Sequence, residues 1–270
     1  MPATTTWHPS MGPLGATVSA SRPVPGRSHR SHTMGARMIA LAGVLAVLVG
    51  GWRVTNSRIF ALRNLRVVGN VRLTTSQVER LAGLTRTTNV FWFSSGKAEG
   101  KLTESPWVAG ATVSRTLPGD VVIRVIERSP VAVVAAPAGR PSLVAADGTV
   151  LGPAGRAGRL PLISVLGSLP SPGGHIDART PGLVVAAALP GSVRRQVASI
   201  DVAADGQIML WLKDGVRVLF GDASEAPAKV EALSAVLSWT SRNGAHLVYV
   251  DVQAPSAPAV LPGGTAVAGP

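Results

Sequence analysis

The chain has 270 residues, 46% of them hydrophobic, so it holds enough apolar material for one sizeable core or two small ones. It contains no cysteine, which excludes disulfides, thiolate metal sites and cysteine nucleophiles. The formal charge of +12 is mostly arginine, but half of it lies in residues 1–58 and only 4% of residues are aromatic, so nucleic-acid binding is not indicated.

Residues 1–37 contain five prolines and no periodic apolar pattern, which predicts a disordered tail on the cytoplasmic side. The next 15 residues, Met38 to Trp52, are uncharged, but as a helix they span only about 22 Å of the roughly 30 Å hydrocarbon core. If the Arg53 side chain extends to the interface, the transmembrane helix lengthens to residues 38–57. The predicted anchor residues are Met38, Leu41, Val44, Leu45, Leu48 and Trp52.

Two other interpretations of this apolar run remain open. A basic tail before an apolar stretch is also typical of a secretory signal, so a signal-cleaved, secreted binding or hydrolytic protein is the alternative. A buried helix of a soluble domain fits less well, because the run is apolar around its whole circumference. Charge does not decide the orientation, since four arginines lie in the 20 residues before the run and five in the 20 after it.

Residues 58–130 have the pattern of a small domain in the order strand, helix, helix, strand, strand. Thr74 with Gln77 matches a capping box at the start of the first helix. The second helix is expected from Ser94 to Leu102, where Gly96 and Gly100 lower the helix propensity. The strands are expected at 60–68, 107–115 and 121–127, the last two as a hairpin.

Residues 131–252 predict a mostly antiparallel β domain, since short apolar runs alternate with Gly, Pro and Asp. Asp-Gly pairs at 205–206 and 214–215 predict the turns of a three-strand meander. Residues 152–182 are rich in Gly and Pro and predict a loop, with a buried strand at Leu162-Ile163 as the alternative for those two residues.

One amphipathic helix is expected late in this domain, with Ser224 as its N-cap and Asn243-Gly244 as its end. A final strand follows at 247–252. Residues 253–270 are again rich in Pro and Gly and predict a second disordered tail. The fold class is therefore α+β, with one N-terminal transmembrane helix and two domains behind it.

No catalytic or ligand-binding set is apparent in the sequence. His175 and His246 are the histidines outside the N-terminal tail, and each is read as a solvated residue. No nucleophile elbow, HExxH helix, Walker loop or GxGxxG occurs. We therefore expect no enzyme activity, no cofactor, no metal and no small-molecule substrate. Arg115, Arg124 and Arg128 are expected on the wet face of a sheet, with lipid headgroups as a minority alternative.

Several short motifs occur in a characteristic order after the apolar run. They are Phe60, Val67-x-Gly69-Asn70, Asn89-Val90-Phe91, Pro106-Trp107-Val108, Arg115-x-Leu117-Pro118 and Glu127-Arg128-x-Pro130. In these residues the chain resembles the FtsQ/DivIB family of bacterial cell-division proteins. The resemblance covers residues 37 to about 255, and Glu-Arg-x-Pro after a Leu-Pro hairpin is its most specific part.

The resemblance implies a POTRA domain at 58–130 and an FtsQ-type β domain at 131–252. It implies a type II protein of the cell membrane at the division septum, with the N-terminus cytoplasmic and the domains extracytoplasmic. It also implies a non-enzymatic scaffold that joins FtsB- and FtsL-type proteins and other divisome components, and that helps control septal peptidoglycan synthesis.

In that family a partner segment adds by main-chain hydrogen bonds to a late strand at a sheet edge. The matching residues here are Leu247, Val248, Tyr249, Val250, Asp251 and Val252. The plainer alternative is that this strand only completes the core. Gln253-Ala254-Pro255 follows where some relatives have a further aromatic residue, so partner contacts beyond Val252 are not expected.

Overall fold

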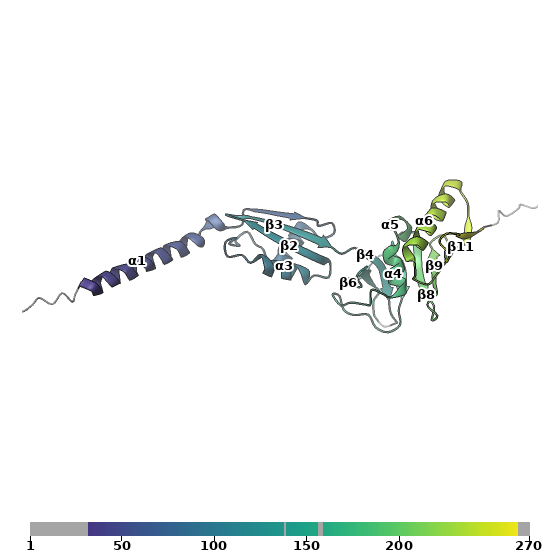
Figure 1. The fold of residues 1–270 in the computed structure, drawn as a ribbon, viewed down its shortest axis with the longest axis horizontal. Coiled ribbons are helices and arrows are strands. Elements are labelled where there is room, and N and C mark those ends of the chain that lie inside the picture. The colour runs from purple at the N-terminus through teal and green to yellow at the C-terminus, as the bar shows by residue number, and fades with distance from the viewer. Residues whose placement is uncertain (1–31, 138, 156–158, 264–270) are drawn as a thin grey trace, which may run out of the picture. The chain divides into compact units, whose positions relative to one another are not determined.

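The computed structural model describes residues 32–137, 139–155 and 159–263. The chain divides between Val54 and Thr55 into two compact units, an N-terminal helix and the part that follows it (Figure 1). Most of the predicted N-terminal tail, up to residue 31, and the last seven residues of the predicted C-terminal tail lie outside the described residues.

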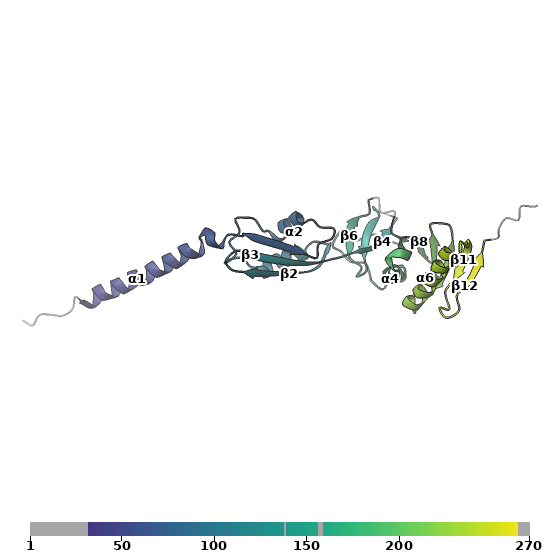
Figure 2. The same cartoon turned by 90° about the horizontal axis from the view of Figure 1, so that it is seen from above.

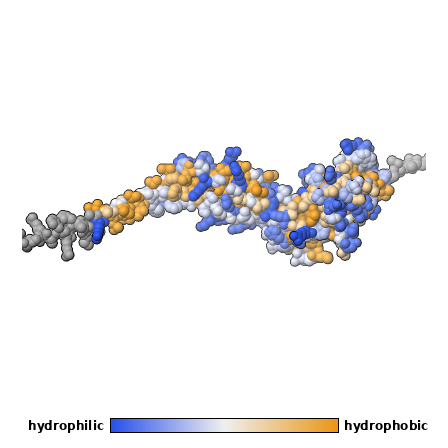
Figure 3. Space-filling view, viewed as in Figure 1, coloured by the Kyte–Doolittle hydropathy of each residue, from blue (hydrophilic) through white to orange (hydrophobic). Residues whose placement is uncertain are grey.

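The N-terminal helix α1 covers His32–Thr55. The predicted disordered tail is therefore wrong for residues 32–37, which are helical, and the helix ends two residues before the predicted residue 57. The segment Arg37–Phe60 is long and apolar enough to cross a membrane, and none of it is buried against the rest of the protein. All six predicted anchor side chains are exposed, as expected if lipid surrounds them. Hydrophobic residues dominate the visible face of this helix (Figure 3).

The first domain after α1 has the predicted order of strands and helices. Its elements are the 3-10 helix η1 (Arg58–Phe60), β1 (Asn64–Val68), α2 (Thr75–Ala82), α3 (Ser95–Thr103), β2 (Val108–Thr116) and β3 (Asp120–Glu127). The sheet order is β1-β3-β2, with β1 parallel and β2 antiparallel to the central β3. The core lies between this sheet and the two helices.

Local sequence signals explain where these helices begin and end. The capping box is present: the Thr74 hydroxyl accepts a hydrogen bond from Gln77 N, and the Gln77 side chain accepts one from Thr74 N. Gly83 ends α2 in the left-handed region with φ 69°, which glycine adopts without strain. Helix α3 forms despite its two glycines because Ala98 and Leu102 are buried in the core.

The second domain contains a nine-stranded sheet. Its strands are β4 (Pro130–Ala135), β5 (Ser142–Ala145), β6 (Val150–Pro153), β7 (Leu162–Ser164), β8 (Val197–Val202), β9 (Ile208–Leu212), β10 (Arg217–Gly221), β11 (Leu247–Asp251) and β12 (Ala259–Pro262). Their order is β12-β11-β10-β9-β8-β7-β4-β5-β6, and five of the eight pairings are antiparallel. Strands β11 and β12 lie side by side at one end of the domain (Figure 2). The predicted meander is β8, β9 and β10.

Helices α4 (Pro181–Ala188), α5 (Gly191–Arg194) and α6 (Ala226–Asn243) belong to this domain. The core joins apolar residues of α4 and α6 to one face of the sheet (Figure 1). Helix α6 matches the predicted amphipathic helix, but its N-cap is Glu225 in the left-handed region and not Ser224. Ser224 instead donates to Asp222 Oδ1, so its hydroxyl belongs to the turn before the helix.

Two parts of the second domain differ from the sequence predictions. Helix α4 was not predicted, because its sequence is almost entirely apolar and lacks the polar face that marks an amphipathic helix. Leu183, Val185 and Ala186 are buried in the core. The tail predicted from residue 253 is wrong for residues 259–262, which form β12 and pair antiparallel with β11.

Candidate partner-binding edge of the second sheet

Side chains that lie opposite one another on neighbouring strands form rows across the sheet. Because successive residues of a strand point to opposite faces, one row faces the core and the adjacent row faces solvent. The core-facing row runs from Ile200 through Leu210, Val218 and Val250 to Val260. The first four side chains are fully buried, whereas Val260 is 41% exposed. The core-facing row therefore ends at β12 in an apolar side chain that the described residues cover only in part.

The adjacent row faces solvent and is amphipathic. It runs from Trp211 through Arg217 and Tyr249 to Leu261. The Arg217 guanidinium lies 6.0 Å from the Trp211 ring centroid, within cation–π range. Burial raises the pKa of Tyr249, and the neighbouring Asp251 raises it further while Arg217 opposes the rise. Tyr249 therefore stays a neutral hydrogen-bonding phenol at physiological pH.

Strand β12 forms the outer edge of this sheet. It pairs with β11 on one side, and no described strand pairs with its other side. All four of its residues are exposed, including Leu261 at 56%, and Val248 on β11 is 43% exposed. This edge therefore offers unpaired backbone groups beside apolar side chains, which is the combination that an added strand can use.

The predicted partner-binding strand, Leu247 to Val252, is β11 and does not lie at the edge. It is parallel to β10 on one side and antiparallel to β12 on the other, so both of its backbone edges are occupied. Val250 and Val252 are fully buried in the core, as the plainer alternative expected. At this end of the sheet the strand with an open backbone edge is therefore β12 and not β11.

The edge residues Val260 and Leu261 were missed because Pro258 and Pro262 flank them in a Pro- and Gly-rich stretch. Proline lacks an N–H donor, so it is excluded from central strands but tolerated on edge strands. An apolar tripeptide between two prolines was the available signal, and it fits an edge strand better than a tail.

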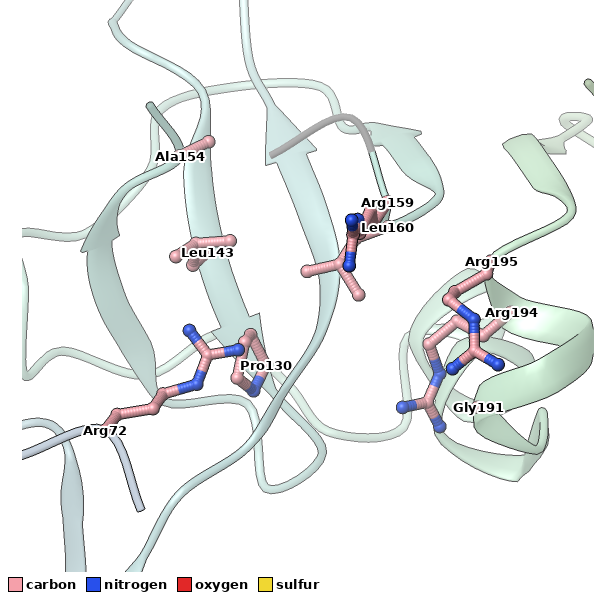
Figure 4. Close-up of a pocket in the computed structure, with 9 residues that line it drawn as sticks. All are labelled: Arg72, Pro130, Leu143, Ala154, Arg159, Leu160, Gly191, Arg194 and Arg195. Atoms are coloured by element: carbon pink, nitrogen blue, oxygen red, sulfur yellow. The ribbon is translucent and has the colours of Figure 1, made fainter. Parts of the chain in front are cut away.

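No group of three or more potential metal ligands occurs within the ranges that the structure describes. His246 is exposed. His175 is also exposed, and its Nε2 lies 3.1 Å from the Thr149 hydroxyl. A hollow of about 480 Å³ is lined by four arginines and by apolar residues (Figure 4). Arginine stays protonated in proteins, so these side chains provide no general base.

Two of the arginines predicted on a wet sheet face also serve as structural donors: Arg115 is exposed as expected, and Arg128 is half-buried. Arg115 Nη1 donates to the carbonyls of Val90, Phe91 and Phe93 and so fixes the loop before α3. Arg128 Nη1 donates to the carbonyls of Pro106 and Val108. Both guanidinium groups therefore stabilise the first domain by hydrogen bonds to its backbone carbonyls.

Arg128 also forms an ion pair with Asp147, with Nε to Oδ2 at 2.7 Å. Burial raises the pKa of Asp147, but hydrogen bonds from Arg128 and Thr149 outweigh it, so the net direction is downward. The third predicted arginine, Arg124, is exposed as expected.

Comparisons with known proteins agree with this architecture. The family model "POTRA domain, FtsQ-type" matches residues 60–128, and the model "Cell division protein FtsQ/DivIB, C-terminal" matches residues 132–253. The second match ends before β12.

Curated relatives include the cell division protein FtsQ of Mycobacterium leprae, 32% identical over 74% of this chain and 55% of the relative, so the chain spans about half of that protein. FtsQ of Streptomyces bingchenggensis is 28% identical over 83% of this chain and 86% of the relative. The extracytoplasmic domain of DivIB from Geobacillus stearothermophilus is 17% identical, covers 43% of this chain and 97% of that chain, and has a TM-score of 0.31, too low to bear on the fold. The two family models together cover most of the chain behind its apolar helix, and the chain belongs to the FtsQ/DivIB family of membrane-anchored cell-division proteins.

Proposed function

We propose that the protein is a non-enzymatic scaffold of the bacterial divisome. Helix α1 anchors it in the cell membrane at the septum, with the N-terminus cytoplasmic and both domains extracytoplasmic. The domains join FtsB- and FtsL-type proteins and thereby help control septal peptidoglycan synthesis. Family membership supports the division role, and the absence of a recognisable catalytic motif in the sequence is compatible with a scaffold.

The observation that carries the proposal is the open edge of β12. An FtsB-type segment that adds to this edge pairs with its free backbone groups and covers Val260 and Leu261, where the two cross-strand rows end. The strand is only four residues long and ends in Pro262. A short edge limited by proline also disfavours pairing between copies of the chain, which a long apolar edge invites.

Single proline substitutions on β12 test the proposal. Backbone N–H groups point alternately to the two sides of a strand, so Val260→Pro and Leu261→Pro each remove a donor from a different side of β12. The variant that removes the outward donor should lose co-purification with the FtsB-type partner while its unfolding midpoint stays unchanged. The other variant should loosen β12 from β11.

Leu166→Pro is the matched control, because it places the same substitution at a fully exposed loop residue of the same domain. It should retain the partner. Partner binding that is undiminished in both β12 variants would contradict addition at this edge. The division role itself would then stand, and the partner would have to contact another surface.

A further inference from the structure

A loop of the first domain is attached to the residue at which α1 ends. Asn89 Nδ2 donates to the Thr55 carbonyl oxygen at 2.7 Å. The same loop pairs with the segment after α1 through a β-bridge between Ala61 and Asn89 and a hydrogen bond of 2.7 Å from Val90 N to Phe60 O. The loop and residues 55–61 are therefore one local structure.

This loop holds a large aromatic side chain in solvent. Trp92 is 60% exposed, although its neighbours on both sides are fixed by the hydrogen bonds from Arg115 to the carbonyls of Phe91 and Phe93. The Phe91 ring meets the Trp92 ring edge-on with centroids 5.0 Å apart. Ile59, in the neighbouring 3-10 helix, is also 53% exposed. A rigid loop that keeps an indole out of the core indicates a contact surface.

Basic side chains lie on the same local structure. Arg58 and Arg86 line a hollow of about 390 Å³ together with polar residues such as Ser57 and Thr87, and no acidic residue is among its lining residues. The wider sequence has the same bias, because residues 32–78 contain six arginines and no acidic residue. The hollow is therefore suited to an anionic group.

Chain connectivity sets how far this surface can lie from a membrane. Helix α1 ends at Thr55, and Arg58 follows three residues later, so the reach between them is at most about 11 Å. That distance keeps Arg58 in or next to the headgroup layer whatever the angle between α1 and the domain. Tryptophan is enriched at membrane–water interfaces, and clustered arginines bind anionic lipid headgroups.

We propose that Ile59, Trp92, Arg58 and Arg86 form a bilayer-binding surface, in which the two apolar side chains enter the interface and the two arginines bind anionic lipid headgroups. This surface holds the first domain in one orientation on the membrane and prevents it from swinging on the short connection after α1. The proposal goes beyond the scaffold function and rests on α1 as the membrane anchor.

The natural chain lacks cysteine, so a single introduced cysteine provides a unique label site. We would spin-label Trp92→Cys and, as a control, Trp239→Cys on α6, which is also exposed. The full chain is placed in nanodiscs that contain phosphatidylglycerol, and accessibility to oxygen and to a water-soluble nickel chelate is measured. The label at position 92 should lie about 5–10 Å below the headgroup boundary, with several-fold lower nickel accessibility than the label at 239. Equal nickel accessibility at the two positions would overturn the proposal.

Charge reversal tests the headgroup contact separately. Arg58→Glu with Arg86→Glu changes only exposed side chains, so thermal unfolding should match that of the parent chain. In phosphatidylglycerol discs the label at 92 should then move toward water, and in purely phosphatidylcholine discs the reversal should have little effect. An unchanged depth in phosphatidylglycerol discs would refute binding of anionic lipid. Failure of α1 to span is distinguishable, because the chain would then not enter the discs.

Discussion

Glu127 illustrates how one side chain closes the first domain. Its carboxylate accepts hydrogen bonds from three consecutive backbone amides, those of Val71, Arg72 and Leu73, at 3.0, 2.8 and 3.0 Å. The turn after β1 is thereby attached to the end of β3. Amides bonded to a carboxylate form strong charge-assisted hydrogen bonds, so the residue acts as a clamp between two segments that are distant in sequence.

Replacing this carboxylate should destabilise the first domain. Glu127→Ala leaves three amides without their acceptor and should lower the free energy of unfolding by about 1–3 kcal/mol. The measurement is urea unfolding of the detergent-solubilised chain followed by tryptophan fluorescence. Glu104→Ala, at an exposed carboxylate after α3, is the control and should change little. Equal stability of the two variants would show that the clamp contributes nothing.

At the scale of elements, an ion pair joins the end of β10 to the first turn of α6. Lys229 is only 4% exposed, and its Nζ lies 2.8 Å from Asp222 Oδ1 and 3.0 Å from the Asp222 carbonyl oxygen. The ammonium group also lies 5.6 Å from the Phe220 ring centroid. A buried ammonium needs such partners, because desolvation without them is unfavourable. The hydrogen bond from Lys229, with one from Ser224, lowers the pKa of Asp222 to about 2.

This shift predicts an acid-dependent loss of stability. Because the folded-state pKa of about 2 lies below the ordinary 3.8, the carboxylate contributes stability at neutral pH, and that contribution is lost as pH falls from about 4 toward about 2. Asp222→Asn should be less stable than the parent chain at pH 7, and the difference should shrink at pH 2–3 in thermal unfolding. Glu231→Gln on the exposed face of α6 is the control. A difference that is constant across this pH range would contradict the linkage.

At the scale of the whole molecule, the proposal predicts that α1 stays uncleaved in the membrane and that the N-terminus is cytoplasmic. Ser28→Cys and Trp239→Cys each introduce the only thiol of the chain, one before α1 and one in α6. A membrane-impermeant maleimide applied to intact cells should label position 239 and should reach position 28 only after permeabilisation. The mass of the membrane-bound chain should be that of the uncleaved protein.

The reverse labelling pattern would contradict the type II topology that we propose. A soluble form beginning near Trp52 would instead support the alternative, a cleaved signal followed by a secreted protein. The two outcomes are distinguishable in a single preparation, because the first changes the labelled position and the second changes the mass.

The accuracy of the sequence predictions depended on how local their signals are. The capping box at Thr74, the Asp-Gly turns of the meander and the amphipathic helix α6 each have their stabilising partner within a few residues, and all were predicted. Helix α4 was missed because its residues are uniformly apolar. The α6 N-cap was wrong because the Ser224 hydroxyl bonds to Asp222 instead.

The sequence by itself determined the apolar helix, the order of elements in the first domain, and the family to which the chain belongs, because these depend on periodicity and on short motifs. Only the tertiary structure decided which strand forms the sheet edge, since β12 is defined by its pairing with β11 and has little strand pattern of its own. The same holds for Arg115, whose three acceptors lie more than 20 residues away in sequence. Contacts between distant segments leave no periodic trace, so the edge and the fixed Trp92 loop became visible only in the folded chain.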